Sequence, residues 1–238
     1  MNATVMQIAW RTVAGRRRGL VLLALPVLLI ALAVVVGALT DPSVDTTLAI
    51  VEGLGVVVIL PLVALIATSS VIVPELEDGS ITYLLAKPIR RSAIVLSKVT
   101  VVALVTIICG VIPIAVAAYI LEPNEPRLVL ALTVGAFVMA LGYSALFMAL
   151  ASTTKHAIIA GIAYIFLWEG LLAQYMPGIR WLSIQRWGLK VADTIRDIST
   201  KANDLPLWYA LLAMAVVVVG GVAWATRRLA RYNLSGED

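Results

Sequence analysis

Long apolar runs alternate with short polar segments along the whole chain. Six of these runs are close to or above the roughly 20 residues that a helix needs to cross a hydrocarbon core of about 30 Å. They are Leu20–Leu39, Leu48–Val73, Ile94–Leu121, Leu128–Ala151, Ala157–Ala173 and Leu207–Thr226. The pattern predicts an all-α integral membrane protein with six transmembrane helices, which form a single transmembrane domain over residues 1–238.

The composition agrees with a membrane protein. Apolar residues make up 61% of the chain and charged residues 13%. A soluble domain has about a quarter charged residues and just under half apolar ones, so an ordinary soluble protein is excluded. The single cysteine, Cys109, lies inside an apolar run, which leaves no disulfide framework and no cysteine cluster for a metal. We therefore expect no metal and no cofactor bound by this chain itself.

The net charge of +4 comes from basic residues at the ends of the apolar runs. This placement is typical of contacts with anionic lipid headgroups and argues against a nucleic-acid partner. With six spans, most basic residues fall on one side of the membrane: Arg11, Arg16, Arg17, Arg18, Lys87, Arg90, Arg91, Lys98, Lys155, Arg227, Arg228 and Arg231. The positive-inside rule then predicts cytoplasmic termini, in a multi-pass protein of the cell (inner or plasma) membrane.

One basic segment, residues 178–201, falls on the other side by this count. Its apolar residues recur at spacings of three and four, as on one face of a helix; they are Ile184, Trp187, Val191, Ile195 and Ile198. We predict an external interfacial amphipathic helix before span six, with Trp181 and Trp187 at the headgroups. A plain external loop is the alternative. Residues 1–19 carry a shorter stripe and are predicted to be a cytoplasmic amphipathic leader, or else a frayed one.

The most charged connection is Val73–Lys98, between spans two and three. Pro74 is expected to open a short helix there, because proline suits the first helical position and the acids after it complement the positive helix end. Pro88 is expected to end this helix. A plain connection between helices takes about two to eight residues, so residues 74–92 predict a cytoplasmic hairpin with a function of its own. The alternative is that its basic residues only set the topology.

The hairpin sequence E-L-E-D-G-S-I-T-Y-L-L-A-K-P-I-R-R-S-A-I-V-L-S-K resembles a motif of ABC-2-type transporter permeases. In that family an E-x-E-x-G-[ST] start leads through leucines to a P-[IVL]-x-R turn and a lysine that opens the next span. The matching positions are Glu75, Glu77, Gly79, Ser80, Leu84, Leu85, Pro88, Arg91 and Lys98. Asp78 and the serine at position 80, where threonine is commoner, depart from the pattern. The six-span frame and the amphipathic segment before span six also resemble the family.

The resemblance implies the transmembrane permease subunit of an ATP-driven exporter. In this family the hairpin docks as a coupling helix on a separate ATP-binding subunit, two copies of which bind ATP and Mg²⁺. The residues expected to make this contact are Glu75, Glu77, Asp78, Gly79, Ser80, Tyr83, Leu84, Pro88, Arg90 and Arg91. The chain has no G-x-x-x-x-G-K-[ST] phosphate-binding loop, so we expect a transport subunit and not an enzyme. The second half of the transporter would be another copy of this permease or a related one.

Two acids and several aromatic residues inside the spans are candidates for the translocation pathway. Glu52 and Glu169 are the only acids that the predicted spans contain, and intramembrane carboxylates are functional suspects by default. Each of them could instead reach water at the interface. Tyr143, Phe147 and Tyr164 could line a path for an amphiphile, although ordinary packing is the alternative. Nothing in the spans selects a substrate.

Small residues on span five are candidates for a contact between two permeases. Ala157 and Gly161 are four residues apart, and such small-xxx-small faces allow helices to approach closely. In the resembled family spans one and five meet across the permease dimer, which implies a dimer interface at these two residues. Chance spacing in an alanine-rich chain is the alternative.

Three other functions remain open at this stage. A permease of an ABC importer would carry an E-A-A…G loop late in the span order, but here the alanine pair is missing and the loop comes early. An integral membrane enzyme would need catalytic polar residues, and no H-E-x-x-H or G-x-S-x-G sequence occurs. A non-transporting scaffold or sensor subunit with the same fold is the third possibility.

Overall fold

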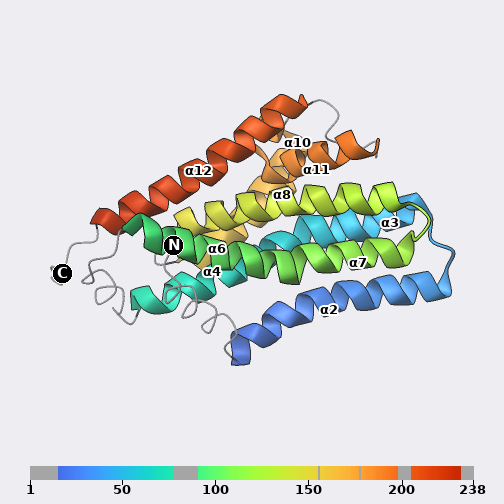
Figure 1. Ribbon diagram of the computed structural model, residues 1–238, viewed down its shortest axis with the longest axis horizontal. Helices are drawn as coiled ribbons and strands as arrows, with labels where there is room; N and C mark the ends of the chain where they lie inside the picture. Colours follow the sequence, from blue (N-terminus) through green and yellow to red (C-terminus); the bar gives the residue numbers. More distant parts are fainter. Residues whose placement is uncertain (1–15, 78–90, 155, 177, 198–204, 232–238) are drawn as a thin grey trace.

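A computed structural model of the chain describes residues 16–77, 91–154, 156–176, 178–197 and 205–231 (Figure 1). The regular structure in these ranges is helical. The α-helices are α2 (Arg16–Leu39), α3 (Val44–Ile50), α4 (Leu60–Glu77), α6 (Arg91–Thr106), α7 (Ile112–Leu121), α8 (Pro126–Ala151), α9 (Ala157–Ala163), α10 (Ala173–Tyr175), α11 (Ile184–Ile195) and α12 (Leu207–Arg231). Wider π-helical segments are η1 (Val51–Ile59), η2 (Ile107–Val111) and η3 (Tyr164–Leu172), and η4 (Ile179–Leu182) is a 3₁₀ helix.

Within the described residues, five helices are long and apolar enough to cross a membrane. They are Leu20–Leu39, Val44–Ile72, Ser92–Leu121, Pro126–Ala151 and Leu207–Arg228. The all-helical membrane fold is therefore confirmed, together with five of the six predicted spans. The remaining one is represented by a shorter apolar helix, Ala157–Leu172, so the count of six stays a prediction.

The long helices lie side by side along the longest axis of the molecule (Figure 1). The start of α2, the end of α4, the start of α6 and the end of α12 lie at the same end, which we call the terminal end. The turns 40–43 and 122–125 lie at the other end, which we call the opposite end. Helices α2 and α12 form two outer edges, with α2 packed on α7 and α12 packed on α8.

Helix α8 forms the centre of the bundle, where it contacts α4, α7, α11 and α12. Its core face consists largely of small residues, namely Ala131, Gly135, Ala136, Ala140, Gly142, Ser144 and Ala145, which are all buried. Small residues let helix backbones approach closely in a membrane. The contact with α12 illustrates this, since a Cβ atom added at Gly221 would lie 2.7 Å from the carbonyl oxygen of Ala145.

Two of the π-helical segments stand directly before prolines. Segment η1 ends two residues before Pro61, and η2 ends two residues before Pro113. Proline donates no backbone hydrogen bond, and its ring clashes with the carbonyl group four residues earlier. In both spans that carbonyl belongs to the π-helical segment, at Val57 and Cys109 respectively. A wider turn before each proline accommodates the ring without ending the helix.

The helix expected to open at Pro74 is not separate from span two. Helix α4 continues through Pro74 and ends at Glu77, and the next described residue is Arg91 at the start of α6. A proline inside a membrane helix is tolerated where other groups satisfy the freed backbone carbonyl. Residues 78–90, which include the expected helix end at Pro88, lie outside the described residues.

The amphipathic helix predicted within residues 178–201 is present as α11, but its apolar face is buried in the bundle. Trp187, expected at the headgroups, is only 4% exposed, whereas Trp181 is 41% exposed. The apolar face of α11 packs on α8, where glycine backbones provide space: a Cβ atom added at Gly188 would lie 2.2 Å from Cγ of Met139. The periodicity of three and four identified the helix, and the small-residue face of α8 determined what covers it.

Candidate functional site

The expected coupling contact lies at the terminal end, between α4 and α6. Glu75 and Glu77 stand in the last turn of α4, and Arg91 is the first residue of α6. The other expected contact residues lie outside the described residues: Asp78, Gly79, Ser80, Tyr83, Leu84, Pro88 and Arg90. Their role in docking an ATP-binding subunit stays a prediction.

Glu169 is the centre of a buried polar cluster. It belongs to η3, and its side chain is almost fully buried, with 3% of the residue exposed. Tyr164 Oη donates to Glu169 Oε1 at 2.8 Å, and the backbone N–H of Ile184 donates to the same oxygen at 2.9 Å. Ser183 Oγ donates to Glu169 Oε2. Both carboxylate oxygens therefore accept hydrogen bonds, and donors from two separate segments of the chain converge on them.

This cluster caps the first turn of α11. Ser183 is the N-cap residue, with extended backbone angles (φ −101°, ψ 122°), and its Oγ accepts from the N–H of Arg186 at 3.2 Å. Ser183 and Glu169 together satisfy two of the amide groups that every helix leaves unpaired at its N-terminus. The positive end of the helix dipole also favours a carboxylate at this place. Glu169 thus joins η3 to the start of α11.

A row of aromatic rings leads from α8 to the same cluster. Tyr143 and Phe147 stack with ring centroids 5.8 Å apart, and Phe147 meets Tyr164 edge to face at 6.1 Å. Tyr164 then stacks on Trp168 at 6.5 Å. Four of the five predicted pathway residues, all except Glu52, are therefore neighbours in the structure. Their contact with a substrate stays a prediction.

The remaining predicted residues lie elsewhere. Glu52 is partly exposed on η1, in another span. Ala157 and Gly161 are buried within this chain. A Cβ atom added at Gly161 would lie 2.2 Å from Cδ1 of Leu65, so this glycine allows α9 to approach α4. Their expected role between two permease copies stays a prediction.

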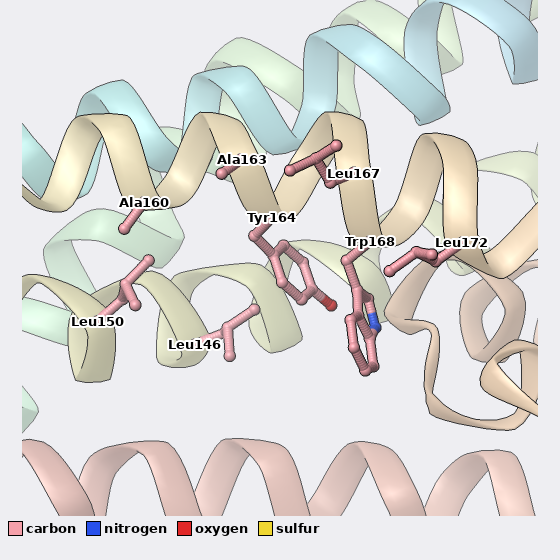
Figure 2. Close-up of a pocket in the computed structure, with 8 residues that line it drawn as sticks. All are labelled: Leu146, Leu150, Ala160, Ala163, Tyr164, Leu167, Trp168 and Leu172. Carbon is pink, nitrogen blue, oxygen red and sulfur yellow. The ribbon is translucent and has the colours of Figure 1, made fainter.

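An apolar cavity of about 410 Å³ borders the aromatic row. Its lining comes from α8, α9 and η3, and consists of Leu146, Leu150, Ala160, Ala163, Tyr164, Leu167, Trp168 and Leu172. Figure 2 shows the Tyr164 and Trp168 side chains extending from η3 into this space. Both polar tips have partners: Tyr164 Oη bonds Glu169, and Trp168 Nε1 donates to the Leu182 carbonyl oxygen at 3.2 Å. The volume is in the range of ligand pockets, and the lining suits an apolar group.

Ser183 is a residue of this site that the sequence interpretation did not single out. A serine directly before an amphipathic helix is a typical N-cap signal, so the sequence alone could have predicted this capping role. Its contact with Glu169, 14 residues earlier, depends on the chain returning to η3 and has no local signal. In the described part of the chain, no group of three or more His, Cys, Asp or Glu residues is placed to hold a metal ion.

Comparison with known families identifies the chain. A family model described as "ABC-2 family transporter protein" matches residues 6–234. No curated protein matched the chain in a sequence comparison. Permeases of this family are multi-pass transport subunits, generally not enzymatic themselves, that normally work with an ATP-binding subunit. Since the match spans nearly the whole sequence, the chain belongs to the ABC-2 transporter family and is a permease component of an ABC transporter.

Proposed function

We propose that this chain is the permease subunit of an ATP-driven exporter and forms the translocation pathway with a second permease, either another copy or a related one. The hairpin at residues 74–92 is the observation that carries the proposal. Its sequence resembles the ABC-2 coupling motif, and α4 and α6 bring its two ends to the terminal end of the bundle. Arg16 begins α2, Arg91 begins α6 and Arg231 ends α12 at that same end, which supports a cytoplasmic orientation.

Coupling would proceed through the helices that flank the hairpin. Two ATP-binding subunits, which bind ATP and Mg²⁺, would each hold one hairpin. Acidic and basic side chains such as Glu77 and Arg90 would set the register of docking, because ion pairs at the rim of an interface contribute more to register than to affinity. Helix α4 packs on both α6 and α8, so a displacement of the hairpin would be transmitted to the centre of the bundle.

The pathway would run beside the aromatic row. Tyr143, Phe147, Tyr164 and Glu169 lie together, and the apolar cavity borders them. The polar tips that face this cavity already have hydrogen-bond partners within the chain, so its walls favour a hydrocarbon group over a polar one. These features support a cargo with an apolar part. Glu52, on another span, would contribute to a different stretch of the pathway.

Copurification tests the proposal directly. The tagged chain is extracted gently from its own membranes, and stoichiometric partners are identified by mass spectrometry. We expect an ATP-binding subunit that is retained by the parent chain and lost in Glu77→Lys. The matched control is Asp41→Lys, which makes the same charge change on an exposed residue at the opposite end and should retain the subunit.

The outcomes separate the alternatives. Absence of an ATP-binding subunit under several mild detergents would overturn the exporter assignment and favour a scaffold or sensor. Retention of the subunit by Glu77→Lys, at equal abundance in the membrane and with normal ATP-dependent transport, would overturn the role of the hairpin.

A further inference from the structure

The apolar cavity that borders the aromatic row is open at the surface of the bundle. None of its eight lining residues is buried: Leu167 is 55% exposed, and the other seven are half-buried. Leu167 also belongs to the outer surface of η3, where Phe166 and Leu171 are exposed as well. Because α8, which forms one wall, spans the membrane, this opening faces the hydrocarbon of the bilayer. The cavity is therefore a groove that the bilayer can enter from the side.

The groove runs from the terminal end to about the middle of the membrane. Its lining begins at Leu150, in the last turn of α8, and at Ala160, in the first turn of α9, and it ends at Leu172 (Figure 2). The separation of Ala160 and Leu172 along the helix is at most about 18 Å at the rise of an α-helix. One leaflet contributes about 15 Å of hydrocarbon, half of a core of about 30 Å. The groove therefore has the depth and direction of one acyl chain.

The walls of the groove suit hydrocarbon. Ala160 and Ala163 end at their Cβ atoms and leave the space open on the side of α9. Tyr164 Oη and Trp168 Nε1 are the polar tips in the lining, and both are bonded within the chain, to Glu169 and to the Leu182 carbonyl oxygen. A methylene chain against these walls would leave neither polar tip without its hydrogen bond, which is the condition for burying it without cost.

The mouth of the groove at the terminal end is bordered by the last part of α12. Trp224 Nε1 donates to Thr153 Oγ1 at 3.1 Å, and Thr153 lies three residues after Leu150. Arg227 and Arg228 follow Trp224 by three and four residues, so they lie on its face of α12, one turn further out, and both are exposed. Tryptophan is enriched at headgroup level, and basic pockets between membrane helices bind anionic headgroups.

We propose that the groove is a binding site for an anionic phospholipid of the terminal-end leaflet. One acyl chain fills the space between α8 and η3, beside Tyr164 and Trp168, and the phosphate group lies at Arg227 and Arg228. The lipid binds the permease itself, so the site does not depend on an ATP-binding subunit. A cargo with an apolar part would enter this groove only by displacing the acyl chain.

Photolabelling tests the site in the full-length chain. The protein is reconstituted in phosphatidylcholine vesicles that contain a small share of phosphatidylglycerol with a diazirine on its acyl chain. After irradiation, the labelled residues are identified by mass spectrometry. We expect label on the lining of the groove, and about fivefold less with a phosphatidylcholine probe that carries the same chain, since one charge contact at the membrane surface contributes about this factor.

Variants in the groove test where the acyl chain lies. Ala160→Phe places a ring in the groove and should abolish labelling of its lining. Ile159→Phe is the matched control, because it adds the same ring to the same helix at a position that is 68% exposed and does not line the groove. Ala163→Leu fills less of the groove and serves if Ale160→Phe does not reach the membrane.

Variants at the mouth test the headgroup contact. Arg227→Gln and Arg228→Gln should each lower labelling by the phosphatidylglycerol probe about fivefold, with a smaller effect in high salt. Labelling by the phosphatidylcholine probe should change less. Arg127→Gln removes the same charge from an exposed residue at the opposite end and is the matched control.

Three results would overturn the site. The first is a parent chain whose groove lining takes no label, or takes it only when the chain is diluted in the vesicles, which would assign the groove to a second copy. The second is equal labelling of the lining in Ala160→Phe and Ile159→Phe. The third is equal labelling by the two probes. Photolabelling needs neither nucleotide nor a partner subunit, so its failure is distinct from a failure of the exporter assignment.

Discussion

Two adjacent glycines on α12 allow a sharp test of helix packing. A Cβ atom added at Gly221 would lie 2.7 Å from the carbonyl oxygen of Ala145 and 3.0 Å from its carbonyl carbon. A Cβ atom added at Gly220 meets nothing within 4 Å. The obstacle at Gly221 is backbone, so it cannot be relieved by rotating a side chain. Gly221→Ala should therefore force α12 away from α8, whereas Gly220→Ala should not.

The magnitude follows from the difference between the two variants. Replacing glycine by alanine inside a helix stabilises it by up to about 1 kcal/mol in soluble hosts, and this gain is common to both variants. Overpacking a tight contact costs about 1–3 kcal/mol. The free energy of unfolding of Gly221→Ala should therefore be lower than that of Gly220→Ala by about 1–3 kcal/mol.

The assay is unfolding in mixed micelles with increasing denaturing detergent, followed by the loss of helix signal and compared at equal protein concentration. Equal midpoints for the two variants would refute the close α8–α12 contact. A Gly220→Ala variant that is the less stable of the two would refute the assignment of the packed face of α12.

Three further predictions concern the ends of α11. Tyr164→Phe removes one of the hydrogen bonds to Glu169 and should lower the free energy of unfolding by about 0.5–1.5 kcal/mol in the same assay; no change would mean that the bond is weak. Ser183→Ala removes both its bond to Glu169 and its N-cap bond and should cost about 1–3 kcal/mol, more than Tyr164→Phe. Arg196→Gln breaks the exposed pair with Glu125, should cost at most about 1 kcal/mol, and should show a smaller effect in high salt than in low salt.

The two ends of the permease differ in the contacts that they make. At the terminal end, α4 and α6 run into the hairpin that is expected to receive the motion of an ATP-binding subunit. Helix α11, which runs along α8 towards the opposite end, is bonded to η3 at its start through the Glu169 carboxylate and packs on α8 through glycines. Helix α8 contacts both α4 and α11, so it is the element through which a displacement at one end would reach the other.

Much of the fold follows from the sequence because the membrane imposes a simple rule. Backbone groups in hydrocarbon need internal partners, so a long apolar run has to be a helix. The positions of Leu20–Leu39 and Pro126–Ala151 could therefore be predicted closely. Prediction was poorer where polarity is mixed, since α4 extends through Pro74 as far as Glu77 and no separate helix opens at the proline.

The sequence by itself determined the helical membrane class, the resemblance of the hairpin at residues 74–92 to ABC-2 permeases and the amphipathic nature of α11, because each depends on neighbours in the chain. Only the tertiary structure decided that Trp187 is buried, that Gly161 meets Leu65, and that Glu169 caps a helix starting 15 residues later. A buried carboxylate needs donors, and nothing local specifies which segment supplies them. The glycines of α8 leave room for α11 to pack closely, and this packing brings Ser183 and Ile184 to Glu169.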